Sequence, residues 1–187
     1  KEIAQKPAAE KVSKHKYKDA DGRLDRKKNG YYELKNTWAS SGQTQVAHSG
    51  LRCCSDTAEQ TWRGLATETG HWALRGFGRW ALEEKATGKF IGNCGLWEPD
   101  GFPEMELGWD LMAGATGKGY ATEAGAAARA HAYNALGRTT VISMIAPGND
   151  GSKAVATRLG AAFEKMFSHV TFGDVEIWRH PTPEALK

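Results

Sequence analysis

The stretch Gly117-Lys-Gly-Tyr-Ala-Thr-Glu-Ala124 decides the fold of this chain, because it joins a strand-like run to a helix-like run through two glycines. The run 104–111 before it alternates apolar and polar side chains, which is the period of a β-strand. The run 121–136 after it consists mostly of strong helix formers, and Gly137 suits the left-handed residue that often ends a helix. The sequence therefore predicts a strand, a glycine loop and a helix in that order.

The glycine loop is a candidate phosphate cradle. The free N–H groups at the start of a helix point toward one place, and the helix dipole adds positive potential there. Gly117 and Gly119 allow the backbone to approach a ligand closely. A pyrophosphate is therefore the expected ligand of the backbone from Gly117 to Thr122. The alternative is a glycine turn that serves only the start of the helix.

Two familiar phosphate loops fit this stretch less well. The P-loop of nucleoside triphosphatases has a Lys followed by a Ser or Thr that binds magnesium, but here Lys118 is followed by Gly119. The dinucleotide fingerprint requires Gly or Ala where this loop has Thr122, and an acidic residue at the next strand, yet the run 139–146 has none. The first pattern is excluded and the second is poorly matched.

Composition limits the classes of protein to which the chain can belong. It has 187 residues, a net charge of +3 and three cysteines, so neither a nucleic-acid partner nor a disulfide framework is indicated. No apolar run approaches the roughly 18 residues of a membrane span, and no signal-peptide pattern opens the sequence. We expect a soluble, cytoplasmic protein with reduced cysteines, no membrane partner and no bound metal.

The chain divides into two parts at Ser55. Residues 1–30 contain ten Lys or Arg side chains against five Asp or Glu and few large apolar ones, so they cannot build a core. We interpret residues 1–54 as a basic, poorly organised N-terminal segment in which 31–34 could form a short strand. A solvated arm is one explanation, and an arm that binds an anionic partner such as ribosomal RNA is the other.

Residues 55–187 have the patterns of an α/β domain. In order, they predict a helix, a hairpin, the strand–loop–helix unit, a buried strand, a short helix and two terminal strands. These elements are expected at 56–72, at 79–85 with 90–97, at 104–136, at 139–146, up to Leu159, at 163–169 and at 171–178.

This order and several motifs resemble the GNAT acetyltransferases, especially the RimJ/RimL-like N-acetyltransferases, over about residues 55–181. The motifs are Gly78-Arg-Trp-Ala-Leu82, Thr87-Gly-Lys-Phe-Ile-Gly92, Cys94-Gly-Leu96, Glu106-Leu-Gly-Trp109, Gly117 to Ala124, and Pro147-Gly-Asn-Asp-Gly-Ser152. In the family's coenzyme A loop, [Q/R]-x-x-G-x-[G/A], the last two fixed places are Gly119 and Ala121, whereas Thr116 departs from the first. The family's opening strand and helix are not legible before Ser55.

The resemblance implies an α/β GNAT fold, with a mixed, mostly antiparallel sheet flanked by helices. It also implies acetyl transfer from acetyl-CoA, as co-substrate, to a primary amine, which is either a protein N-terminal α-amine or a small molecule. A homodimer is compatible with this class. The alternative is a non-catalytic acyl-CoA-binding or regulatory module, because Thr116 departs from the loop pattern and the family's tyrosine acid falls near Ala156.

The resemblance further assigns roles to individual residues. The Leu111 backbone N–H would polarise the thioester carbonyl, and the pantetheine arm would lie like an extra strand against residues 110–112. The other expected coenzyme contacts are Met112, Thr116, Gly117, Lys118, Gly119, Tyr120, Ala121, Thr122, Asn149 and Ser152.

The candidate catalytic residues are Glu106, as the base that removes the amine proton, and Ser152. Glu104 on the same strand face is a second candidate base, and a solvated sheet face is the alternative for both carboxylates. For Asn149 and Ser152 the alternative is helix capping. We interpret His131 as a packing or surface residue, and the tryptophans Trp62, Trp72, Trp80, Trp97 and Trp109 as core.

Overall fold

A computed structural model of the chain describes residues 31–32, 46–47 and 58–187. Its strands are β1 (Tyr31–Tyr32), β2 (Val46–Ala47), β3 (Arg79–Glu84), β4 (Lys89–Trp97), β5 (Glu106–Met112), β6 (Ile142–Ile145), β7 (Ala162–His169) and β8 (Gly173–Arg179). Its helices are α3 (Ala58–Arg75), α4 (Tyr120–Asn134) and α5 (Asp150–Arg158), followed by a short 3-10 helix, η2 (Glu184–Leu186).

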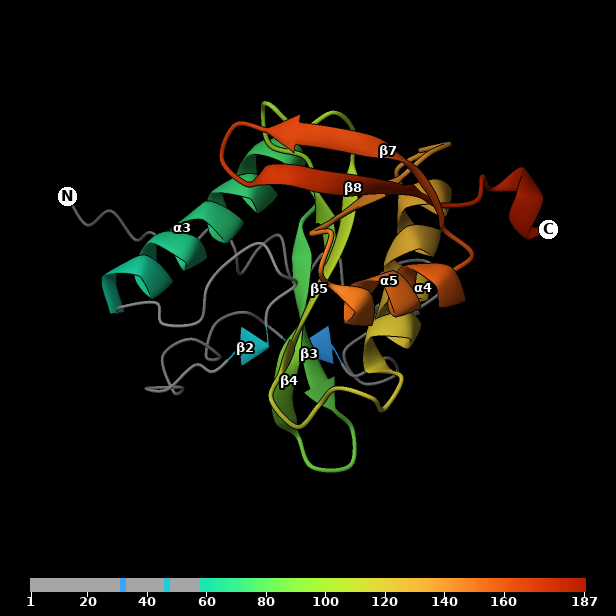
Figure 1. The fold of residues 1–187 in the computed structure, drawn as a ribbon. Helices are drawn as coiled ribbons and strands as arrows, with labels where there is room; N and C mark the ends of the chain where they lie inside the picture. The colour runs from blue at the N-terminus through green and yellow to red at the C-terminus, as the bar shows by residue number, and fades with distance from the viewer. Residues whose placement is uncertain (1–30, 33–45, 48–57) are drawn as a thin grey trace.

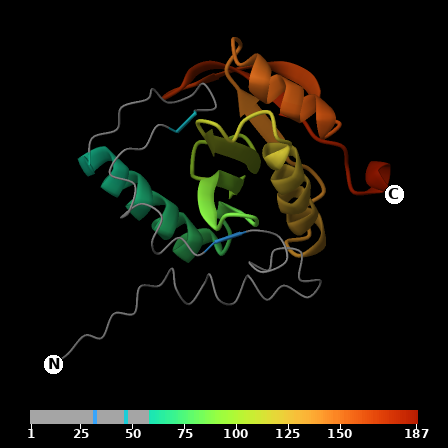
Figure 2. The same ribbon diagram turned by 90° about the horizontal axis from the view of Figure 1, so that it is seen from below.

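The strands form one sheet in the order β1-β3-β4-β5-β6-β8-β7, and β2 also pairs with β5. Within the described residues β5 and β6 run parallel, whereas the other neighbouring strands run antiparallel. Helix α3 lies on one side of the central strands, and α4 and α5 lie on the other (Figure 1). The view from below shows the same layers (Figure 2). The predicted α/β architecture with a mixed, mostly antiparallel sheet is confirmed.

The main core lies between the sheet and α4. Trp80 and Leu107 from the sheet are 2% and 0% exposed, and Ala128 and Ala132 of α4 are both 0% exposed. Alanine side chains are short, so α4 can approach the sheet closely while it keeps a high helix propensity. The alanine-rich sequence of this helix therefore serves packing, and it fixes the glycine loop at the end of β5.

The sequence predicted most of these elements. The hairpin of β3 and β4, the strand before the glycine loop, helix α4, helix α5 and the two terminal strands are confirmed. The strand expected at 139–146 is shorter, because only Ile142–Ile145 pair with β8. The short strand suggested at 31–34 is present as Tyr31–Tyr32, which pairs with β3, while β2 was not expected. Most of the segment 1–54 lies outside the described residues.

The burial of the tryptophan side chains tests the predicted aromatic core. Trp72, Trp80 and Trp109 are buried as expected, and Trp97 stacks on His71 with ring centroids 4.1 Å apart. Trp62 lies outside the side chains that the structure describes. None of the helices in the described part of the chain is long and apolar enough to cross a membrane.

Candidate active site

The glycine loop leaves the start of α4 open to a ligand. Gly117 and Gly119 have φ angles of +77° and +86°, which L side chains rarely adopt. Gly119 is the N-cap of α4 and supplies no side-chain hydrogen bond to the first turn. Among the described residues, a Cβ atom at either glycine would have no neighbour within 4 Å. The N-cap thus gives the first N–H groups of this 15-residue helix no side-chain acceptor, as an anion site requires.

Glu84, at the end of β3, connects the glycine loop to the β3–β4 hairpin through hydrogen bonds. Its carboxylate accepts hydrogen bonds from the Tyr120 hydroxyl at 2.6 Å and the Thr87 hydroxyl at 2.7 Å. Lys118 Nζ lies 4.0 Å from the same carboxylate. The hydrogen bonds from Thr87 and then Tyr120 lower the pKa of Glu84, so it stays ionised. Sequence analysis missed this anchor, because nothing in a single strand shows which loop it meets.

Strands β5 and β6 pair through one register position and then stop pairing. That position is Glu106 opposite Ile142, where the Ile142 N–H donates to the Met105 carbonyl at 3.0 Å. Among the described residues no further β5–β6 pair follows. We call the region beyond this pair, between Leu107–Met112 and Ser143–Ile145, the β5–β6 fork.

The far end of the fork holds β2. Val46 pairs with Met112 and Ala47 with Leu111, on the edge of β5 opposite to β4. The resemblance to the acetyltransferases placed the pantetheine arm along this edge. A chain segment and a pantetheine arm cannot use the same backbone groups at once, so a ligand along Leu111 and Met112 requires β2 to move.

Glu106 is a buried carboxylate at the base of the fork. Its residue is 4% exposed, so the alternative of a solvated sheet face is wrong. Burial raises the pKa of Glu106 to about 7, and the negative charge of Asp110 adds to this rise. The positive charge of Arg79, whose Nη2 lies 3.6 Å from Glu106 Oε2, and the Met144 backbone N–H act in the opposite direction. A carboxylate with a pKa near 7 can both accept and release a proton at neutral pH.

Arg79 forms ion pairs with three acidic side chains on the α3 side of the sheet. Its guanidinium lies 3.0 Å from Asp110 and 4.0 Å from Glu68 of α3, and 5.4 Å from the ring centre of Trp97. Burial alone would lower the pKa of Arg79, but the surrounding carboxylates raise it overall, so the guanidinium stays charged. Gly108 makes this possible, because a Cβ there would lie 3.2 Å from Arg79 Nη2.

Known proteins provide a comparison for this chain, which combines a helix start without a side-chain cap, a strand fork and a buried carboxylate. A family model described as an acetyltransferase (GNAT) domain matches residues 29–162. The chain belongs to the GNAT acetyltransferase family. The family match begins 26 residues before Ser55, and it includes β1 and β2, so it extends into the segment where sequence analysis found no family element.

Several GNAT proteins are similar to this chain. A solved acetyltransferase of Agrobacterium tumefaciens strain C58 is 33% identical, with a TM-score of 0.60 over 67% of this chain and 72% of that one. The uncharacterized protein YkkB of Bacillus subtilis strain 168 is 31% identical over 120 residues, which are 63% of this chain and 67% of YkkB. Mycobacterium smegmatis RimJ, solved with a coenzyme A disulfide, shares the fold, with 22% identity and a TM-score of 0.55 over 69% of this chain and 64% of RimJ.

The GNAT motif Pro147 to Ser152 starts helix α5. Asn149 is the N-cap, and its Oδ1 accepts a hydrogen bond from the Ser152 N–H at 3.0 Å, so it does cap the helix. The Asn149 Nδ2 atom is also buried and has no hydrogen-bond partner among the described residues, which leaves a donor for a ligand. Ala156, near which the resemblance places the family's tyrosine, is 0% exposed and has no hydroxyl to offer.

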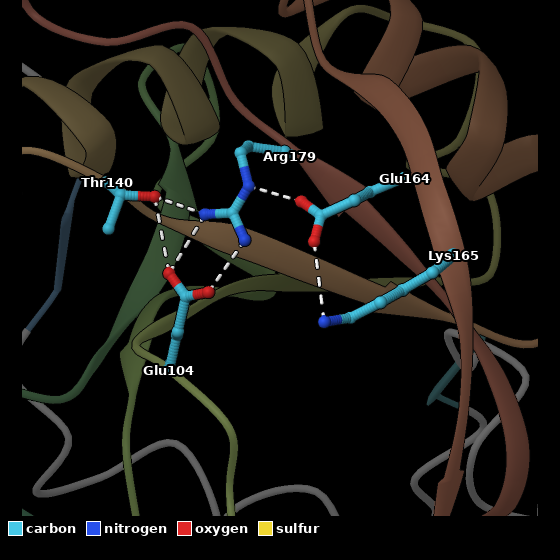
Figure 3. Close-up of polar contacts among 5 residues, drawn as sticks. All are labelled: Glu104, Thr140, Glu164, Lys165 and Arg179. Atoms are coloured by element: carbon cyan, nitrogen blue, oxygen red, sulfur yellow. Dashed lines mark hydrogen bonds and ion pairs between the residues drawn. The ribbon is translucent and has the colours of Figure 1, made fainter.

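Glu104, the second candidate base, is held by another residue. The Arg179 guanidinium donates to both of its oxygens, at 2.9 and 2.6 Å, and to the Thr140 hydroxyl (Figure 3). Arg179 also donates to Glu164, which pairs with Lys165 at 3.5 Å. These hydrogen bonds from Arg179 lower the pKa of Glu104, which therefore suits cross-strand bonding rather than proton removal.

Two other chemically active side chains belong to the core. His131 is 6% exposed and packs edge-to-face on Trp80, with ring centroids 5.3 Å apart, as expected for a packing histidine. Cys94 is fully buried, and burial raises the pKa of its thiol to about 12, so it is no nucleophile at neutral pH. Cys53 and Cys54 lie outside the described residues.

Proposed function

We propose that this chain is an N-acetyltransferase that moves an acetyl group from acetyl-CoA to a primary amine. The GNAT family supports acetyl transfer in general. The observation that carries the finer proposal is the buried Glu106 carboxylate, whose pKa of about 7 suits a general base beside the β5–β6 fork.

The groups around the fork suit each part of that reaction. The backbone N–H groups from Gly117 to Thr122 would bind the pyrophosphate, and Asn149 Nδ2 would donate to the coenzyme. Bound acetyl-CoA would supply the reactive thioester. Glu106 takes one proton from the acceptor ammonium, and the free amine then attacks the thioester carbonyl. The C–N bond forms as the C–S bond breaks, and the second proton of the nitrogen passes to the departing thiolate. Ser152, in the first turn of α5, is our candidate for a hydroxyl near the departing sulfur.

The charges around Glu106 support a cationic acceptor. Three carboxylates, on Glu68, Glu106 and Asp110, lie within 4.0 Å of the guanidinium of Arg79. An excess of negative charge attracts an ammonium group and opposes an anionic acceptor. A protein N-terminal α-amine and a small-molecule amine both satisfy this requirement.

Thiol release from acetyl-CoA tests the proposal. The purified full chain would be assayed with a short peptide that has a free N-terminus, with a small diamine, and with the same peptide after N-terminal acetylation. We expect thiol release with one of the free amines and none with the blocked peptide. Acetyl-CoA binding without any amine-dependent release would instead support a non-catalytic acyl-CoA-binding module, which the alanine at position 156 favours.

The position of β2 leads to a prediction about coenzyme affinity. Ala47→Pro removes the backbone N–H that faces Leu111 and disfavours the strand, so it should release the Leu111–Met112 edge. We expect acetyl-CoA to bind about threefold or more tightly, because a ladder hydrogen bond contributes about 0.5–1.5 kcal/mol. Calorimetry on the wild type, Ala47→Pro and Ala47→Val measures this, and the valine variant keeps the N–H as a control. Unchanged or weaker binding by the proline variant would show that β2 does not compete with the coenzyme.

A further inference from the structure

Three buried polar side chains form a chain directly behind the β5–β6 fork. The Ser143 hydroxyl on β6 lies 2.6 Å from the Leu107 carbonyl oxygen and 3.0 Å from His180 Nε2. His180 Nδ1 lies 3.3 Å from Arg129 Nη1, and Arg129 also donates to the Leu159 carbonyl. Ser143 and His180 are both 2% exposed, and Arg129 is 8% exposed. None of these groups has a role in the proposed reaction so far.

The direction of each hydrogen bond follows from the chemistry of the groups. A carbonyl oxygen only accepts, so the Ser143 hydroxyl donates to Leu107. Ser143 Oγ then accepts from the protonated Nε2 of His180, and the bare Nδ1 accepts from Arg129. Burial and the neighbouring Arg129 charge lower the pKa of His180 to about 3, which keeps the ring neutral as this pattern requires. A single arrangement of protons therefore accounts for every hydrogen bond in this row of side chains.

The position of Ser143 explains how the strands stop pairing. In a continuous parallel ladder, the next bond after the Glu106–Ile142 pair would join the Met144 N–H to the Leu107 carbonyl. The Ser143 hydroxyl takes that carbonyl instead. The Met144 backbone N–H acts on the Glu106 carboxylate, where it lowers the pKa and opposes the effect of burial. The Ser143 hydroxyl thus replaces the Met144 N–H as the donor to the Leu107 carbonyl. The Met144 N–H interacts instead with Glu106, the candidate base.

We propose that Ser143, oriented by His180 and Arg129, is a positioning residue that holds the β5–β6 fork open and directs the Met144 N–H to Glu106. This inference rests on the proposed function for its consequence in catalysis, whereas the exchange of hydrogen bonds does not depend on it. Removal of the hydroxyl leaves the Leu107 carbonyl without its donor, and the Met144 N–H is the replacement that a continuous ladder would supply. The ladder then extends by one bond into the fork, and Glu106 loses a donor.

The test compares Ser143→Ala with Ser143→Thr, which keeps the hydroxyl. In the free wild-type protein, the NMR shift of the Met144 amide proton should follow the ionisation of Glu106 near pH 7. In Ser143→Ala this pH dependence should disappear, the acetyl-CoA Kd should rise at least tenfold, and the pH midpoint of kcat/KM should move upward. Ser143→Thr should restore all three properties toward the wild type.

Val175→Ala is the control for a general loss of stability. Val175 is 0% exposed and lies in a separate apolar cluster with Ile142, Met144 and Ile177, so its truncation weakens the core without removing a fork hydrogen bond. Equal changes in Val175→Ala and Ser143→Ala would overturn the positioning role, as would a Met144 amide that still titrates in Ser143→Ala. A wild-type protein that releases no thiol would instead refute the proposed function, and the amide titration would still decide whether the hydrogen bonds exchange.

Discussion

Gly119→Val is expected to lower acetyl-CoA affinity by about 100-fold or more, which corresponds to about 3 kcal/mol of binding free energy. Gly119 has φ = +86° and is the N-cap of α4, so a β-branched residue there must change the backbone that aims the first N–H groups. A Cβ in the present conformation would meet no atom of the described residues within 4 Å, so the expected loss comes from the backbone conformation and not from a clash within the protein. Calorimetry with acetyl-CoA measures the change.

Gly101→Val is the matched control for backbone strain. Gly101 has φ = +92°, and a Cβ there also has no neighbour within 4 Å, but it lies in the loop between β4 and β5. Both variants should lose stability to a similar extent, because both force an L side chain into the left-handed region. Only Gly119→Val should lose coenzyme affinity. Equal affinities for Gly119→Val and the wild type would refute the phosphate cradle at this loop.

The strand–loop–helix unit could be predicted from sequence because local patterns determine it. Alternation with period two, a run of helix formers and glycines at φ-positive positions each act within a few residues, and β5, α4 and the loop between them follow. The same holds for the hairpin of β3 and β4, where Gly88 with φ = +67° lies in the turn. Motifs of this kind also supported the family resemblance before any geometry was known.

The environment of Glu106 could not be predicted, because it depends on strand register and on α3. Alternation places Glu106, Gly108 and Asp110 on one face, and in isolation that face is polar and solvated. The register brings Arg79 opposite Gly95, and Gly95 opposite Gly108, so a long side chain fills the space that the glycines leave. A glycine inside a strand was the one available signal, since it often marks such a close approach.

Glu106→Gln is the second substitution with a large expected effect, because it removes the proposed base while it preserves shape and hydrogen bonding. We expect kcat to fall by about 100-fold or more, with little change in acetyl-CoA affinity. The wild-type kcat/KM should rise with pH through about 7, where Glu106 loses its proton. In the variant the rate should follow only the free-amine fraction of an acceptor of known pKa. Near-full turnover of Glu106→Gln across this profile would exclude Glu106 as the base.

The same substitution should stabilise the fold, and the pH dependence of that gain distinguishes a burial cost from other causes. The pKa of Glu106 is raised from 4.5 to about 7 on folding, so the folded protein holds this proton more tightly than the unfolded chain. Burial of the ionised side chain therefore costs nothing below about pH 4.5 and an increasing amount of folding free energy between pH 4.5 and 7. Above that range the cost is at most about 3.5 kcal/mol, at about 1.4 kcal/mol per pH unit. Thermal melting should show equal stability near pH 4 and a higher Tm for Glu106→Gln at pH 8.

Arg79 keeps its 3.0 Å contact with Asp110 in the variant, so loss of the 3.6 Å pair with Glu106 leaves the guanidinium compensated. A lower Tm for Glu106→Gln at pH 8 would show that the Arg79 pair outweighs burial, and it would place the pKa of Glu106 too low for a base that takes protons at neutral pH.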